Sequence, residues 1–131
     1  MVAITTLSGQ QVDVADETIA LVAGPYPHDV GPHTYVYGPT TGALITGEAP
    51  DVMVGRLRNH QDFAKLTRPN GSPAWVCAKA VSAVRAPLST EAPEPGEGLV
   101  NAVVVIGKLR QSVQEQVSAA IHILTDHGAQ L

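Results

Sequence analysis

The sequence predicts a β-rich α+β fold made of two tandem copies of one unit: a β-hairpin, two further strands in small antiparallel sheets, and a helix. Three observations predict it. Residues 3–22 align without a gap with residues 65–84 at a shift of about 62 residues, a spacing typical of internal repeats. Under this shift Gly9 coincides with Gly71, where a tight hairpin turn needs a residue that adopts φ > 0. Apolar positions also coincide, and each half ends in a helix-like run.

The first copy is expected to begin with a hairpin whose strands span residues 2–7 and 11–14. The apolar positions shared by the copies form the buried face of this hairpin, and a third strand over residues 18–23 follows. Residues 24–32 are too rich in Pro and Gly for a regular element, so they predict an exposed loop. A strand at residues 34–38 (TYVYG) comes next.

A short helix is expected to close the first copy. Gly42 marks a turn before Leu44, as a second turn glycine does in the other half. Pro50 is suited to the first position of a helix, in which Val54 and Leu57 would face inward.

The second copy repeats this order. Its hairpin and third strand span residues 65–84, and the acidic, Pro-rich segment 87–98 predicts a longer loop. Strand 101–106 (NAVVVI) then leads through a turn into a helix over residues 114–127. The helix is predicted by apolar residues at a period of about 3.6, namely Val117, Ala120, Ile121 and Leu124.

Two repeats, residues 1–60 and 61–131, are expected to share one compact unit and to pack about a pseudo-two-fold axis. Each repeat alone has a length of about 60 residues, at which a hydrophobic core is marginal. Small sheets also leave strand edges unpaired, and such edges accept strands from other chains. We therefore expect a homo-oligomer.

Charge and composition exclude several classes. The net charge is −4 and the pI is near 5.6, whereas general nucleic-acid binding relies on a basic surface. No apolar run reaches the length of about 18 residues that a membrane span needs, and no secretory signal is recognisable. The single cysteine, Cys77, excludes an internal disulfide and suits a reducing compartment. We expect a cytoplasmic protein without membrane insertion.

Several stretches of the second copy match a known family. They are LTRPNG at residues 66–71, the Trp75 and Val76 strand, AVSAV at residues 80–84, and VVVIGKLRQSVQEQVSAAI at residues 103–121. The second copy resembles the small FlbD-type flagellar and swarming proteins, and similar short domains encoded by phages. In that family a strand, a turn glycine and a strand run into a helix through a motif like V-x-E-S-V-x-x-V.

The resemblance implies a small β-sheet with a C-terminal helix and no catalysis, and it gives no catalytic residues to carry over. Gln114, Glu115 and Val117 sit in the region of the family motif, without its full acidic character. The resemblance covers the second copy well and the first copy faintly. The duplication and the long acidic loop depart from the single-copy pattern of that family.

Catalytic and metal-binding signatures are not found in the sequence. His28 and His33, with Asp29 between them, fit no zinc spacing. Cys77 lies mid-strand without an activating neighbour, so a small buried thiol is favoured over a nucleophile. No G-x-S-x-G, P-loop or G-x-G-x-x-G motif occurs. We therefore expect no enzyme activity, no metal and no cofactor.

Five residues of the second copy form the candidate ligand-binding set: Arg68, Asn70, Trp75, Lys108 and Arg110. They flank two hairpins, so adjacent hairpins would gather cations beside the only Trp. Such a surface stacks a planar ligand and clamps a phosphate. The alternative is that the charges are solvated strand ends and that Trp75 fills a subunit contact. Tyr35, Tyr37 and the loop at residues 26–33 offer another interface.

The leading functional prediction is a non-catalytic cytoplasmic module for binding or assembly, acting as a homo-oligomer and of phage-encoded type. The alternative is a small-molecule sponge or sensor. It would capture an anionic, nucleotide-like ligand at subunit clefts lined by Arg68, Trp75 and Arg110. The partners expected are copies of the chain, a small anionic ligand or a second protein.

Overall fold

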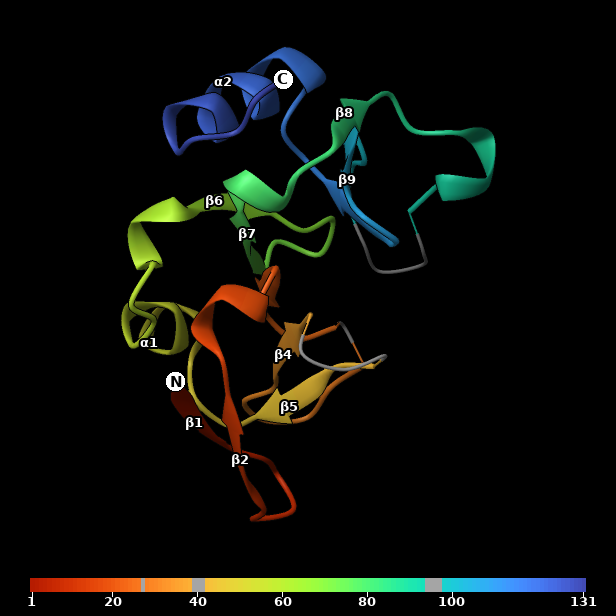
Figure 1. Cartoon of the computed structure of the whole chain (residues 1–131). Coiled ribbons are helices and arrows are strands. Elements are labelled where there is room, and N and C mark those ends of the chain that lie inside the picture. The colour runs from red at the N-terminus through yellow and green to blue at the C-terminus, as the bar shows by residue number, and fades with distance from the viewer. Residues whose placement is uncertain (27, 39–41, 94–97) are drawn as a thin grey trace.

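The computed structural model describes residues 1–26, 28–38, 42–93 and 98–131, and these contain ten strands, two α-helices and four 3-10 turns (Figure 1). The first half comprises β1 (Val2–Thr5), β2 (Gln11–Val14), η1 (Asp16–Thr18), β3 (Leu21–Ala23), β4 (Thr34–Tyr37), β5 (Leu44–Thr46) and α1 (Pro50–Gly55). The second half comprises η2 (His60–Asp62), β6 (Phe63–Thr67), β7 (Pro73–Cys77), η3 (Ala78–Ala80), β8 (Ala83–Arg85), η4 (Ser89–Glu91), β9 (Ala102–Ile106), β10 (Leu109–Val113) and α2 (Val117–Asp126). The predicted β-rich α+β class is confirmed.

The order of hairpin, 3-10 turn, three strands and helix occurs in both halves, and so does the strand pairing. In the first hairpin Val2 pairs with Val14, and in the second Ala64 pairs with Val76, at the same offset. The registers of β3 with β4 and of β8 with β9 also correspond. The repeated order therefore extends to which residues face each other across each ladder.

Among the described residues, one strand pairing connects the two halves. A five-stranded sheet has the order β5-β4-β3-β7-β6, so β3 of the first half lies antiparallel to β7 of the second. The Gly24 N–H donates to the Pro73 carbonyl at 2.8 Å, and the Cys77 N–H donates to the Ala20 carbonyl at 2.9 Å. The other strands form a two-stranded sheet, β1-β2, and a three-stranded sheet, β10-β9-β8.

The expected pseudo-two-fold packing is wrong. A two-fold axis would pair β8 with β2 as well as β3 with β7, because β8 is the counterpart of β3 and β2 that of β7. Among the described residues only the second pairing forms. The β1-β2 hairpin lies at one end of the molecule and β8 at the other (Figure 1). The two halves are thus arranged head to tail.

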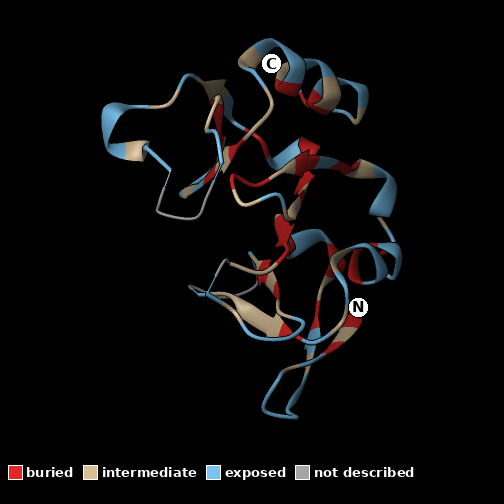
Figure 2. Ribbon diagram, turned by 180° about the vertical axis from the view of Figure 1, so that it is seen from behind, coloured by how far each residue is buried: buried red, intermediate tan, exposed pale blue. Residues whose placement is uncertain are grey.

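The five-stranded sheet separates two hydrophobic cores, because successive side chains of a strand point to opposite faces. Buried residues of the first core are Val2, Ile4, Val14, Ile19, Val22, Val36, Met53, Val54, Leu57, Phe63 and Cys77. Those of the second core are Leu21, Ala23, Ala64, Leu66, Ala74, Val76, Ala78, Val81, Ala102, Val104, Ile106, Val113, Ala120, Leu124 and Ala129. Helix α1 packs against β3 and β7, and α2 packs against β6, β8 and β9 (Figure 2).

Some element bounds differ from the sequence-based prediction. The strand expected over residues 18–23 is shortened by η1, in which the Thr18 hydroxyl donates to the Ala15 carbonyl at 2.7 Å. Helix α2 begins after residue 116 because the two residues expected to start it bond elsewhere. The Gln114 N–H donates to the Thr67 carbonyl, and the Glu115 carboxylate accepts from the Thr67 N–H and hydroxyl.

The expected loop at residues 87–98 contains a turn, η4, held by an ion pair. Arg85 donates twice to the Glu91 carboxylate, at 2.7 and 2.8 Å. Residues 94–97 of this loop lie outside the described residues. Neither helix in the described part of the chain has the length or the apolar stretch required to cross a bilayer.

Candidate functional site

A cavity of about 230 Å³ lies where the two halves meet. The first half contributes β3, β4 and the loop between them, and the second half contributes the end of β6 and strand β10. The lining residues are Leu21, Tyr26, Tyr37, Arg68, Pro69, Leu109, Arg110, Gln111 and Ser112. The cavity is therefore completed only when both halves are present.

Arg68 lines this cavity, and only 5% of its surface is exposed. It follows β6, and its backbone closes the second hairpin turn by donating to the Ser72 carbonyl at 2.8 Å. Its guanidinium donates to the Gly24 carbonyl at 2.7 Å and lies 4.0 Å from the centre of the Tyr26 ring. The side chain thus ties the second half to the loop of the first through a hydrogen bond and a cation–π contact.

Three tyrosines of the first half form a cluster beside Arg68. The rings of Tyr26 and Tyr35 meet edge to face at 4.9 Å, and the Tyr26 and Tyr37 hydroxyls are 3.2 Å apart. Asp29 orients the cluster, since it accepts the Tyr35 hydroxyl at 2.9 Å and the Tyr26 N–H at 2.8 Å. Two of these hydroxyl-bearing rings, those of Tyr26 and Tyr37, line the cavity.

The ionisation of this cluster is set by its surroundings. Burial, followed by the hydrogen bond to Asp29, raises the pKa of Tyr35 to about 12. Burial and the Tyr26 hydroxyl also raise the pKa of Tyr37 above its usual value. Burial acts to raise the pKa of Asp29, but the Tyr26 N–H and the Tyr35 hydroxyl outweigh it, so that this pKa is lowered. At neutral pH the Tyr35 and Tyr37 phenols therefore stay protonated beside the ionised Asp29 carboxylate.

Arg110 supplies a second guanidinium from strand β10. It is exposed, in contrast to Arg68. Among the described residues neither arginine forms an ion pair with a carboxylate. Buried cations are normally paired, so an unpaired Arg68 beside Arg110 leaves a positive site with room for an anion.

The chemistry of this site suits a small anion or the anionic group of a larger ligand. Guanidinium groups bind carboxylate and phosphate through charge-assisted hydrogen bonds, and protonated phenols donate as well. The volume is about 230 Å³, whereas pockets for drug-sized ligands begin at about 300 Å³.

The structure brings two of the five predicted binding residues to this cavity, Arg68 and Arg110. Asn70 instead braces the hairpin turn: its amide donates to the Pro25 carbonyl at 2.6 Å and its oxygen accepts the Ser72 N–H at 3.0 Å. Lys108 is exposed in the turn between β9 and β10 and does not line the cavity.

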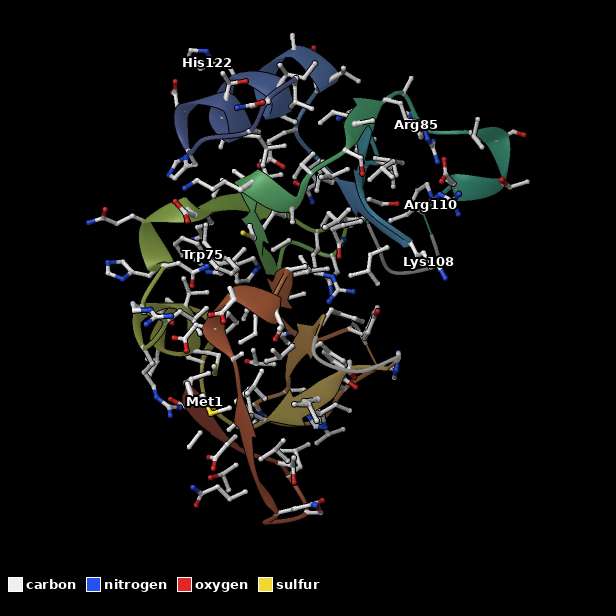
Figure 3. The ribbon with its side chains drawn as sticks, in the orientation of Figure 1. Met1, Trp75, Arg85, Lys108, Arg110 and His122 are labelled. Carbon is white, nitrogen blue, oxygen red and sulfur yellow. The ribbon has the colours of Figure 1, made fainter. Side chains whose placement is uncertain are left out.

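Trp75 is also absent from the cavity. Its ring packs against the first core, on the face of the sheet opposite Leu21, and Lys65 lies 5.9 Å from its centre. It lies away from Arg110 and Lys108 (Figure 3). The aromatic ring next to Arg68 is that of Tyr26 instead. The period-2 spacing of Tyr35 and Tyr37 was the available signal for a tyrosine cluster, but nothing in the sequence links it to Arg68.

Other reactive groups are separate from the cavity. Among the described residues, no group of three or more His, Cys, Asp or Glu side chains is placed to hold a metal ion. Cys77 is buried, and burial raises the pKa of its thiol. A raised pKa disfavours the thiolate, which is the reactive form.

Two strand edges form a second candidate site. Within the described residues β2 pairs with β1 alone, and β8 pairs with β9 alone. Gln11 and Asp13 on β2 are exposed, and so is Ala83 on β8. Each strand therefore has a row of backbone donors and acceptors along one side that no other strand pairs with.

Comparison with known proteins provides no relative: no protein-family model, no curated protein and no solved structure matches the chain.

Proposed function

We propose that this chain is a non-catalytic assembly module that associates with copies of itself through its strand edges. One observation carries the proposal. The β3–β7 pairing joins one unit to the next within the chain, while the strands in the same two positions at the outer ends, β8 and β2, have no such partner among the described residues. A fold that accepts a strand from its neighbour once can accept one again from another copy.

We further propose that the second copy is related to FlbD-type and phage-encoded domains, a resemblance that implies a small β-sheet without catalytic residues. We also propose that the protein is cytoplasmic and homo-oligomeric and that it arose by duplication of one unit. The matching hairpin registers of the two halves support that duplication.

The oligomeric state tests the assembly function. Light scattering after size exclusion, over a range of protein concentrations, should give a mass that rises above the chain mass of 13.7 kDa. Ala83→Lys places a charge on the exposed β8 edge and should shift the protein toward the monomer. Ala92→Lys, at an exposed residue outside the strands, is the matched control and should leave the mass unchanged. A monomer at every concentration would exclude the proposal.

A second candidate function is capture of a small anionic ligand, favoured by the unpaired Arg68 and Arg110 at one cavity. A ligand that binds the native state raises the melting temperature. Inorganic phosphate and nucleoside phosphates should therefore stabilise the protein in a thermal-shift measurement. Arg110→Ala should abolish the shift, whereas Lys108→Ala, which removes an exposed cation outside the cavity, should retain it. An equal shift in both variants would place the ligand elsewhere.

A further inference from the structure

The pairing of β3 with β7 provides a template for a contact between copies. On that basis, and resting on the assembly function above, we propose that copies join head to tail, with β8 of one copy adding to β2 of the next. The contact would repeat the internal junction in the same antiparallel register. It differs from an unspecified edge contact because it fixes which residues face each other.

The register follows from the offset between the halves. Within the chain Leu21 pairs with Val76, Val22 with Trp75, and Ala23 with Ala74. Replacing each residue by its counterpart in the other half gives the three pairs between copies. They are Ala83 with Val14, Val84 with Asp13, and Arg85 with Val12.

The backbone groups needed for this ladder face outward. In an antiparallel pair, residues that exchange hydrogen bonds alternate with residues that do not. Gly24 with Pro73 and Ala20 with Cys77 are hydrogen-bonded pairs, and they lie two residues on either side of Val22 and Trp75. Val22 and Trp75 are therefore also a hydrogen-bonded pair. Their counterparts, Val84 and Asp13, turn the same backbone groups toward the unpaired edges.

Flanking bonds extend the predicted ladder by one step at each end. The counterpart of the Gly24 bond is an Ala86 N–H donating to the Gln11 carbonyl of the next copy. The counterpart of the Cys77 bond is an Ala15 N–H of the next copy donating to the Ser82 carbonyl. Among the described residues, neither N–H has another backbone partner outside the strands.

The side chains make the contact between copies more polar than the internal junction. Asp13 takes the place of Trp75, and Arg85 takes the place of Ala23, which is fully buried. Arg85 is already paired with Glu91. With charged groups in place of apolar ones, less apolar surface is buried, so this association is weaker than the internal pairing and reversible.

Head-to-tail pairing of two copies leaves the β2 edge of one copy and the β8 edge of the other without a partner. The β1-β2 hairpin and β8 lie at opposite ends of the molecule (Figure 1), so β8 and β2 of one copy cannot pair with each other. Contacts between unlike surfaces continue until they close into a ring or extend as a filament.

Disulfide trapping between single-cysteine proteins tests the register. All variants carry Cys77→Ala, so that the native thiol cannot react. Asp13→Cys mixed with Val84→Cys, and Gln11→Cys mixed with Ala86→Cys, place the thiols opposite each other, within the Cα separation of about 4.4–6.8 Å that a disulfide needs. The swapped mixtures, Asp13→Cys with Ala86→Cys and Gln11→Cys with Val84→Cys, shift each pair by two residues, to about 7 Å or more.

The expected result is a heterodimeric disulfide in the two matched mixtures, at about tenfold the yield of the swapped mixtures. Equal yields in all four mixtures, or a dominant disulfide between two Asp13→Cys chains, would overturn the inference and leave self-assembly standing. A monomer in light scattering without any trapped product would overturn both the inference and the assembly function.

Discussion

Gly9 and Gly71 occupy the same backbone setting in the two halves: φ is +88° and +90°, and each N–H donates at 2.9 Å to the carbonyl three residues earlier. A Cβ atom built at either position meets nothing within 4 Å. The two turns therefore differ in sequence but not in the backbone conformation that they require.

Gly9→Ala and Gly71→Ala should destabilise the protein equally. Each variant holds a side chain at positive φ without a clash, so the cost is strain alone, about 1–2 kcal/mol. Chemical denaturation measures it. Gly55→Ala, in helix α1 and in open space, is the control and should be neutral or slightly stabilising. A large cost at one turn and none at the other would mean that the turns are not equivalent.

Gly38→Ala should be far more damaging. Here φ is +123°, and an added Cβ would lie 2.1 Å from the Thr18 carbonyl oxygen and 2.9 Å from the Ala20 nitrogen. Both contacts are to backbone, which cannot move aside without disturbing η1 and β3. We expect a loss of about 3 kcal/mol or more in the free energy of unfolding. A loss similar to that of Gly9→Ala would show that the backbone relaxes.

The turns and the last helix could be predicted from the sequence because their signals are local. A glycine required at φ > 0 and an apolar period of about 3.6 residues both lie within one short window. The junction could not be predicted. Strand β3 is three residues long and buried on both faces, so its pattern does not tell which strand lies on either side.

Only part of the candidate site could be predicted, again because only local signals can be read from the sequence. Arg68 and Arg110 stood out as cations beside turns, which is a local feature. The Tyr26 ring lies against Arg68 only because the β3–β7 pairing brings its loop there. Trp75 was assigned to the wrong surface, since the face on which a strand residue lies depends on which core covers it.

The pair of Arg85 and Glu91 should make stability depend on pH in the acid range. The hydrogen bonds from Arg85, followed by that from the Leu88 N–H, lower the pKa of Glu91 from 4.5 to about 2. Because this folded-state pKa is lowered, the stabilisation is present above about pH 4.5 and is lost as the pH falls through about 2. The melting temperatures of the native sequence and of Glu91→Gln should differ by a constant amount above roughly pH 5. They should become equal as the pH falls through about 2. Curves that stay parallel throughout would contradict this.

Tyr35 should contribute to the pH dependence of stability in the alkaline range. Burial and the Asp29 carboxylate raise its pKa from 10.0 to about 12. Since the folded-state pKa is raised, the stabilisation is complete below 10.0 and is lost as the pH rises through about 12. The difference in tyrosinate absorbance between the native sequence and Tyr35→Phe reports the ionisation of Tyr35. This difference should therefore titrate at about pH 12. Titration near 10.0 would mean that the ring is open to solvent.

Arg68→Lys should be costly although it keeps the charge. An ammonium cannot reproduce the guanidinium contact with the Tyr26 ring together with the bond to the Gly24 carbonyl, so we expect a loss of about 1.5–3 kcal/mol in the free energy of unfolding. Urea denaturation provides the measurement. Arg110→Lys, at an exposed position of the same cavity, should change stability by about 0.5 kcal/mol at most. Equal effects would remove the distinction between the two arginines.

Since β7 of one half completes the sheet of the other, severing the chain near Asn59 would yield two fragments that complement each other. The fragment 1–60 would lose Phe63 and Cys77 from its core. The fragment 61–131 would keep β7 but lack β3, so the β7 edge would stay unpaired until the first fragment supplied β3. The two fragments would therefore act as a split reporter, in which pairing of β3 with β7 brings the two parts together.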